Sequence, residues 1–462
     1  MDNLATQETE NRRLRRIILC ALFGVFLCTA VGCASSGLTP YAENPASTGV
    51  TPAAKAAPRK IVTNKSVIST NFGFVKDVAW SPDNKYFAVA QTTRMNASIV
   101  VYDAKTQKIV RSMEPRKCGP YAGDHEFITG GKVAFSPDGR YLAGGFGIIT
   151  LWETKTWQPV RDVLGPFSRG ANAAGPVQSI AFSPDSMAIA ILYSSVIWPE
   201  SVYVGGRDET LARLRQRKID KSPDPFTHEA ALMVFDVETA TRRYYFKQEH
   251  ATDKINRFGH MFSGGISYSP DGKYILTNHW GGMRHDFLTK DDDPSKYDIR
   301  LAFRDAKSGK SLKEISDVHA MRITASTFSH NGKLIATGTT TGSKENTRNL
   351  LAGPWVWFKN HNEDPIRIWD AATGAKLMEL GPLRGSPKSL AFSPDDRVLV
   401  SCQTDIKENE NIWLWDLTSG QLIERVAIPK SWNNTYSCAI SPDGRTIAMT
   451  DDNRIIIVSI KQ

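Results

Sequence analysis

The sequence lacks the short motifs that mark common catalytic centres. It contains no Gly-x-Ser-x-Gly elbow, no glycine loop that cradles phosphate and no His-Glu-x-x-His zinc motif. The repeated part of the chain has no lysine or arginine run, although the formal net charge is +9. We therefore predict no enzymatic activity, no cofactor and no nucleic-acid partner. A chain that is 41% hydrophobic and 23% charged is expected to be globular with a solvated surface.

Long apolar runs are also missing, apart from one near the N-terminus. Four arginines between residues 12 and 16 precede sixteen apolar or small residues at 17–32. This run is shorter than the roughly 20 residues that cross a bilayer as a helix, and its charged start is typical of a secretory signal peptide. Residues 30–33, Ala-Val-Gly-Cys, resemble the bacterial lipoprotein signal, in which the cysteine is lipidated.

The resemblance implies that residues 1–32 are a cleaved signal peptide and that Cys33 carries the lipid. Because alanine rather than aspartate follows Cys33, it further implies an outer-membrane lipoprotein that faces the periplasm. The alternatives are an inner-membrane-anchored periplasmic protein and an uncleaved N-terminal anchor. Residues 33–58 are rich in Ala, Ser, Thr, Pro and Gly, and we expect a flexible tether with a mean reach of about 25–30 Å.

A phrase built on Ser-Pro-Asp-Gly, or a near copy of it, recurs through the rest of the chain. The first residues of the seven quartets are Ser81, Ser136, Ser183, Ser269, Ser329, Ser393 and Ser441. The fifth quartet reads Ser-His-Asn-Gly, and Asp396 replaces the glycine of the sixth. Proline presets φ, Asp or Asn bonds its own backbone, and glycine adopts a positive φ. With apolar residues on both sides, each copy predicts a β-hairpin.

After each hairpin we expect a third strand that ends in an aromatic residue and an acid, then a turn and a fourth strand. Residues 369–374 read Trp-Asp-Ala-Ala-Thr-Gly and residues 415–420 read Trp-Asp-Leu-Thr-Ser-Gly; Arg304-Asp305 is a weaker version with one extra residue. The pattern resembles the WD-repeat family over residues 59–462. It implies an all-β fold, a seven-bladed β-propeller of four-stranded antiparallel blades. Only the fifth copy has the family's histidine, His319, ten residues before its quartet.

The last repeat ends after its third strand, residues 454–460, and would leave an exposed edge. Residues 60–63, Lys-Ile-Val-Thr, resemble the fourth strand of the first blade, Lys-Ile-Val-Arg at 108–111. We therefore predict that residues 60–68 are an N-terminal strand that completes the last blade and closes the ring.

Only three cysteines follow Cys33, namely Cys118, Cys402 and Cys438, and an odd number does not indicate a disulfide framework. Cys402 and Cys438 fall on expected strands of neighbouring repeats. We interpret them as small buried hydrophobic side chains, with a disulfide between them as the alternative.

The long connections of the expected propeller gather on one face. In a blade the quartet turns and the Trp-Asp turns share one face, here called the quartet face, and the other connections share the opposite insert face. The inserts are residues 114–131, 164–177, 194–230, 247–264, 279–298 and 340–364. Eight of the nine histidines fall on the insert face, and long loops often carry function.

The candidate binding residues of the insert face are Trp198, Tyr203, His260, His279, Trp280, His285, Trp355, Trp357 and Phe358. Aromatic side chains with polar tips suit recognition surfaces, although they also pack beneath long loops. His260, His279 and His285 could converge with Asp286 on zinc or copper, but no pair has a recognised ligand spacing, and we predict no metal site.

Two functional hypotheses follow. The first is a monomeric, envelope-anchored, non-catalytic scaffold that binds an unknown protein of the cell envelope through the inserts of blades two to five. It would contact the membrane through the lipid on Cys33. The alternative is a propeller that binds a small molecule, glycan or metal, or acts as an enzyme, with its site at the channel mouth on the insert face.

Overall fold

The computed structural model describes the strands and tight turns of the repeated region. The described residues are 61–70, 73–92, 97–115, 131–163, 177–197, 227–247, 261–262, 265–281, 298–316, 318–319, 323–339, 365–383, 385–403, 410–428 and 435–461. Residues 1–60, which include the predicted signal peptide, Cys33 and the whole predicted tether, lie outside this set. Among the described residues, no helix has the length and hydropathy that crossing a membrane requires.

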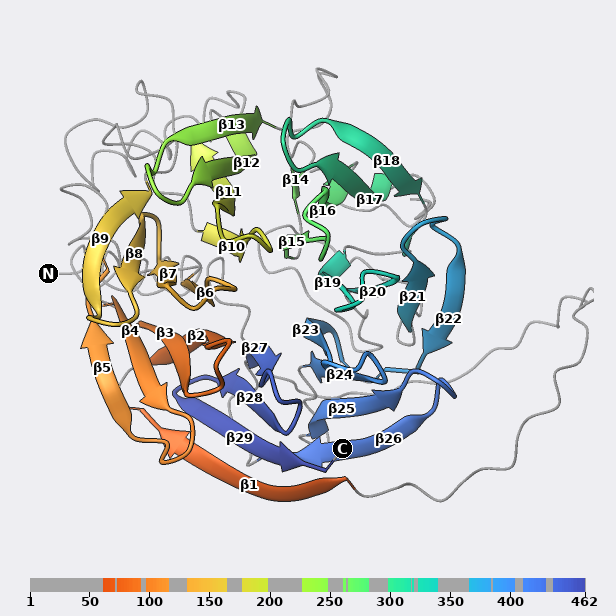
Figure 1. Cartoon of the computed structure of the whole chain (residues 1–462). Coiled ribbons are helices and arrows are strands. Elements are labelled where there is room, and N and C mark those ends of the chain that lie inside the picture. The colour runs from red at the N-terminus through yellow and green to blue at the C-terminus, as the bar shows by residue number, and fades with distance from the viewer. Residues whose placement is uncertain are drawn as a thin grey trace, which may run out of the picture. The chain divides into compact units, whose positions relative to one another are not determined.

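The strands form seven antiparallel sheets, each of which is one blade (Figure 1). Blade 1 contains β2 (Phe74–Trp80), β3 (Tyr86–Thr92), β4 (Ala97–Asp103) and β5 (Ile109–Met113). Blade 2 contains β6 (Lys132–Phe135), β7 (Tyr141–Gly145), β8 (Ile149–Glu153) and β9 (Gln158–Val163). Blade 3 contains β10 (Val177–Phe182), β11 (Ala188–Ile197), β12 (Thr227–Asp236) and β13 (Arg242–Lys247).

Blade 4 has its inner strand in two pieces, because β14 (Met261–Phe262) and β15 (Ser267–Tyr268) both pair with β16 (Tyr274–Gly281). The sheet continues with β17 (Asp298–Asp305) and β18 (Ser311–Ser316). Blade 5 contains β19 (Ile323–Phe328), β20 (Leu334–Thr339), β21 (Ile366–Asp370) and β22 (Lys376–Leu380). Blade 6 contains β23 (Pro387–Phe392), β24 (Val398–Gln403), β25 (Glu410–Asp416) and β26 (Leu422–Ala427).

Blade 7 contains β27 (Thr435–Ile440), β28 (Thr446–Asp451) and β29 (Arg454–Ile460), and its outer strand is β1 (Val62–Ser69). The inner strands of neighbouring blades touch around the whole circle, from β2 through β6, β10, β15, β19, β23 and β27 back to β2. The prediction of a seven-bladed propeller of four-stranded antiparallel blades is therefore confirmed (Figure 1).

The core of the propeller lies in the seams between blades. The second and third strands of each blade are covered by a neighbouring sheet on both faces, so they are continuous apolar runs rather than alternating ones. In β3, for example, Phe87 to Ala90 are fully buried, and in β29 Ile455 to Val458 are at most 4% exposed. One cluster joins Leu151 of blade 2 to Ile189 of blade 3. Burial of this kind between sheets is the main stabilising term of the fold.

The N-terminal strand closes the ring as predicted. β1 pairs antiparallel with β29, from Val62 opposite Ile460 to Ser69 opposite Arg454. Its first residues also bond blade 6, since the backbone N–H groups of Ile61 and Val62 both donate to Oε2 of Glu424, at 2.8 and 2.9 Å. Strand pairing and this carboxylate together remove the open edge that the last repeat would otherwise expose.

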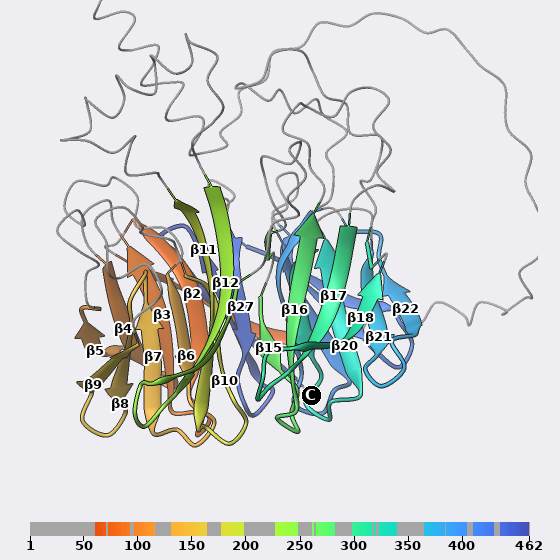
Figure 2. The same ribbon diagram turned by 90° about the horizontal axis from the view of Figure 1, so that it is seen from above.

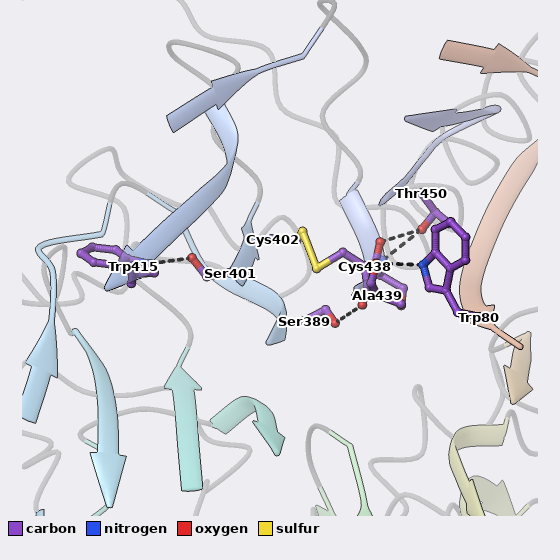
Figure 3. The surroundings of a disulfide bond; sticks show 9 residues. Trp80, Ser389, Ser401, Cys402, Trp415, Cys438, Ala439 and Thr450 are labelled. Carbon is purple, nitrogen blue, oxygen red and sulfur yellow. Dashed lines mark hydrogen bonds between the residues drawn. A yellow bond between two sulfur atoms is a disulfide. The ribbon is translucent and has the colours of Figure 1, made fainter. Parts of the chain in front are cut away.

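A disulfide joins Cys402 of β24 to Cys438 of β27, across the seam between blades 6 and 7 (Figure 3). Our interpretation of these cysteines as buried but unpaired hydrophobic side chains was therefore wrong in its second part. Both residues are buried, with 0% and 5% of their surface exposed, and their Cα atoms lie 6.2 Å apart. The pairing depends on the contact between two blades, which no spacing along the chain reveals. Cys118 lies outside the described residues.

Candidate functional site

The quartet face consists of short turns that bond themselves. In the first copy the Ser81 hydroxyl donates to Oδ1 of Asp83 at 2.7 Å and accepts the Tyr86 N–H at 2.9 Å. The other six copies repeat both bonds with their own serine and acid or amide. The Ser269 hydroxyl and the Lys273 backbone and ammonium groups lower the pKa of Asp271. These serine and acid side chains therefore make hydrogen bonds within their own turns.

Both ends of the ring closure lie on the quartet face. The N–H of Ile460, at the end of β29, donates to the carbonyl of Arg445, which directly follows the last quartet turn. Lys461 then donates its N–H to the carbonyl of Ile61. The described chain therefore begins on the quartet face. In Figure 2 the C-terminus is also labelled on the side of the ring where the tight turns lie.

Most candidate residues of the insert face lie outside the described residues: Trp198, Tyr203, His260, His285, Trp355, Trp357 and Phe358. Trp280 belongs to β16, but its side chain also lies outside the description. Their proposed role in binding stays a prediction. The strands reach further than expected, because β11 extends to Ile197 and β16 to Gly281. The inserts of blades 3 and 4 are correspondingly shorter than the sequence suggested.

His279 lies within β16 and not in the insert where the sequence analysis placed it. Its side chain is buried, and its Nε2 accepts a hydrogen bond from Nη2 of Arg304 at 3.0 Å. Because a guanidinium only donates, Nε2 must be unprotonated in this arrangement. The lone pair that would bind a metal is thus occupied by Arg304.

Arg304 takes the place of the aromatic residue at the end of the third strand of blade 4. It is 2% exposed, its Nε donates to the Thr277 hydroxyl at 3.2 Å, and its guanidinium lies 3.7 Å from the ring centroid of Phe246 in blade 3. Burial lowers the pKa of Arg304 to about 10, partly offset by the nearby Glu314, so the side chain remains charged at neutral pH. The charge binds two blades together by a cation–π contact.

Blade 5 contains the histidine network expected from the WD-repeat resemblance. Nε2 of His319 lies 2.8 Å from the Thr337 hydroxyl, and Nε1 of Trp369 donates to the same hydroxyl at 2.8 Å. All three side chains are buried. Blade 6 has the tryptophan–hydroxyl bond of this arrangement, since Nε1 of Trp415 donates to the Ser401 hydroxyl at 3.1 Å.

The insert-face ends of inner strands β2 and β6 carry a group of charged residues that sequence reasoning did not identify. Lys76 stands at a bulge near the start of inner strand β2, next to Asp77, and Lys132 starts the neighbouring inner strand β6. Asp77 accepts the Val133 N–H at 3.1 Å and lies 3.8 Å from Nζ of Lys132. Burial and the charge of Lys132 lower the pKa of Lys76 to about 8, against the opposing effect of Asp452.

Metal binding gains no support from the part of the chain that is described. Within it, no group of three or more His, Cys, Asp or Glu side chains is arranged to hold a metal ion. His260, His285 and Asp286 lie outside it.

Blade number, Trp-Asp turns and the His319 network define the class of this protein, a WD40-like β-propeller. No family model matches the chain. It is similar to WD repeat and SOCS box-containing protein 1 of Mus musculus, at 31% identity over 83 residues, which is 18% of each chain. It is also similar to the Homo sapiens protein of that name, at 29% identity over 99 residues, 21% of this chain and 22% of the relative. The chain thus spans about a fifth of the length of the curated relatives it matches.

Proposed function

We propose that this protein is a non-catalytic interaction scaffold whose partner docks on the insert face of blades two to five. The observation that carries the proposal is the closed ring, in which seven blades hold their longer connections on one face while the quartet face consists of self-bonded turns. A WD-repeat propeller of this kind is typical of protein-interaction scaffolds. A rigid core that presents loops on one side is also how many binding surfaces are built.

We further propose that the scaffold works outside the cytoplasm, anchored by lipid on Cys33. The disulfide between Cys402 and Cys438 supports this location, because disulfides persist in oxidising compartments such as the bacterial periplasm and are rare in the cytosol. Ile61, the first described residue, lies on the quartet face beside the chain end. A lipid anchor N-terminal to Ile61 would therefore be connected to the propeller at its quartet face, which would leave the insert face accessible to a partner.

A second candidate function is binding of a small anionic molecule at the channel mouth. Lys76 and Lys132 favour it, since both lie at the insert-face ends of neighbouring inner strands and the lowered pKa of Lys76 reflects a partly desolvated ammonium. Asp77 and Asp452 are close to these lysines and reduce the positive charge available to a ligand.

The test of the scaffold is a crosslinking pull-down of the lipidated protein from envelope extracts, compared between two matched variants. Trp355→Ala with Trp357→Ala alters the insert face, whereas Lys85→Ala with Lys273→Ala removes two exposed side chains of the quartet face whose ion pairs are solvent-screened. We expect the first pair to lose partners that the wild type captures and the second pair to retain them. Equal capture by all three proteins would contradict the proposed face.

The anchor is tested separately by Cys33→Ser, which should release the protein from the membrane fraction at precursor length or after cleavage elsewhere. Continued membrane attachment at full precursor length would instead favour an uncleaved N-terminal anchor. Binding of inorganic phosphate or a dicarboxylate that is lost in Lys76→Met, with partner capture unchanged, would support the second candidate function.

A further inference from the structure

In six of the seven quartet turns, the fourth residue contacts the turn of the preceding blade. Where this residue is glycine, it leaves space for the preceding proline. A Cβ built on Gly139 of blade 2 would lie 3.3 Å from Cγ of Pro82 in blade 1, and one on Gly332 of blade 5 would lie 3.3 Å from Cδ of Pro270 in blade 4. Both glycines have positive φ, at 72° and 70°. These two joints, like the one between Gly272 and Pro184, therefore pack a proline ring against a glycine.

Where the fourth residue is not glycine, its side chain hydrogen-bonds the preceding turn. Asn84 of blade 1, with φ of 60°, donates from Nδ2 to Oδ2 of Asp443 in blade 7 at 2.8 Å. Ser186 of blade 3, with φ of 61°, accepts the backbone N–H of Asp138 in blade 2 at 3.0 Å. Asparagine is one of the few side chains that tolerate the left-handed backbone, whereas serine does so less readily. In both turns the hydrogen bond to the neighbouring blade offsets part of the cost of this backbone conformation.

The joint between blades 5 and 6 differs from all the others, because both of its partners depart from the repeated phrase. His330 stands where six copies have proline, and Asp396 stands where four copies have glycine. Oδ1 of Asp396 accepts the His330 N–H at 2.7 Å, and Oδ2 accepts the Asn331 N–H at 2.8 Å. The imidazole Nδ1 of His330 lies 3.2 Å from the same carboxylate, whose side chain is 8% exposed.

The two departures depend on each other. A proline at position 330 would supply no N–H, and the Asp396 carboxylate would then be buried against a ring with one of its two backbone donors missing. A glycine at position 396 would leave the His330 and Asn331 N–H groups without this acceptor. We infer that His330 and Asp396 are a coupled pair that replaces the proline–glycine joint with a polar one and holds blade 6 against blade 5. This inference does not depend on the proposed function.

The test is a double-mutant cycle on the full mature chain, with thermal unfolding as the readout. His330→Pro removes the His330 N–H bond and the imidazole contact, whereas Asp396→Gly removes the acceptor of both backbone bonds. We expect each variant to lower Tm by about 1–4 °C. The double variant restores the joint that exists between blades 1 and 2, and we expect it to regain most of that loss. A double variant whose loss equals the sum of the two single losses would overturn the coupling.

Gly139→Asp serves as a matched control, because it places a carboxylate against Pro82, which offers no N–H. Combined with His330→Pro, it should give additive losses, since the two sites belong to different joints. If a single variant fails to accumulate as folded protein, recovery of folded protein in the double variant is the supporting result, and failure of the double variant as well is the contrary one. Amide hydrogen exchange adds a local readout, because the Asn331 N–H should lose its protection in Asp396→Gly.

Discussion

Removal of the Cys402–Cys438 disulfide should destabilise the propeller without changing its strand pairing. The bond joins residues 36 apart in sequence and closes a loop that runs through blade 6 into blade 7. In the loop-entropy treatment, a closed loop of this length stabilises the folded state by about 4 kcal/mol, within a general range of roughly 0–5 kcal/mol. With an unfolding entropy of about 2.1 cal/mol/K per residue over about 400 residues, that free energy corresponds to a decrease in Tm of roughly 5 °C.

The assay compares differential scanning calorimetry of the oxidised protein with the Cys402→Ala, Cys438→Ala variant. Because both cysteines are almost completely buried, a thiol reductant should reach the bond in the native protein far more slowly than in denaturant, and alkylation should report the difference. Cys402→Ala alone is the control, since it leaves Cys438 as a free thiol. Equal Tm values for oxidised and disulfide-free protein, or prompt alkylation of both thiols in native protein without reductant, would refute the reasoning.

Three further predictions concern other parts of the ring. Glu424→Ala removes the acceptor of the N–H groups of Ile61 and Val62 at the start of the closing strand, and should lower the free energy of unfolding by about 1–3 kcal/mol. Hydrogen exchange of the Val62 amide should speed up more than that of amides in the inner strands. An unchanged exchange rate at Val62 would contradict this prediction. His319→Ala should lower stability by roughly 2 kcal/mol, while the same substitution at exposed His330 in an Asp396→Gly background should matter less; calorimetry of both variants decides this. Because the pKa of Lys76 is lowered, the unfolded chain binds more protons than the folded one between about pH 8 and 10.5. The free energy of unfolding should therefore rise with pH across this window. Lys76→Met should abolish that rise, which curves of Tm against pH would measure.

Much of the fold could be predicted from local turn chemistry. Each Ser-Pro-Asp-Gly turn is determined by residues within the quartet, since the serine hydroxyl, the acid and the positive φ all act across four to six positions. Ring closure was also predictable, because a third strand at Arg454–Ile460 without a successor requires a partner and the sequence offers one at Val62–Ser69.

The candidate site was less accessible to sequence reasoning. His279 was assigned to a loop because it follows the apolar part of its strand, yet its pairing with Arg300 in β17 keeps it within the sheet. Lys76 was overlooked, since its lowered pKa arises from burial and from Lys132 on the next blade. Neither the pairing of His279 with β17 nor the proximity of Lys132 to Lys76 can be predicted from the spacing of residues along the chain.

The sequence by itself determined the seven hairpins, the order of the blades and the strand that closes the ring, because turn formation and strand alternation are local properties of the chain. The tertiary structure alone decided which side chains meet across the seams. Cys402 bonds Cys438, Arg304 packs against Phe246, and Asp396 accepts the N–H of His330. These contacts depend on the rotation of one sheet against the next, a quantity that is set by packing of the whole ring and not by any segment within it.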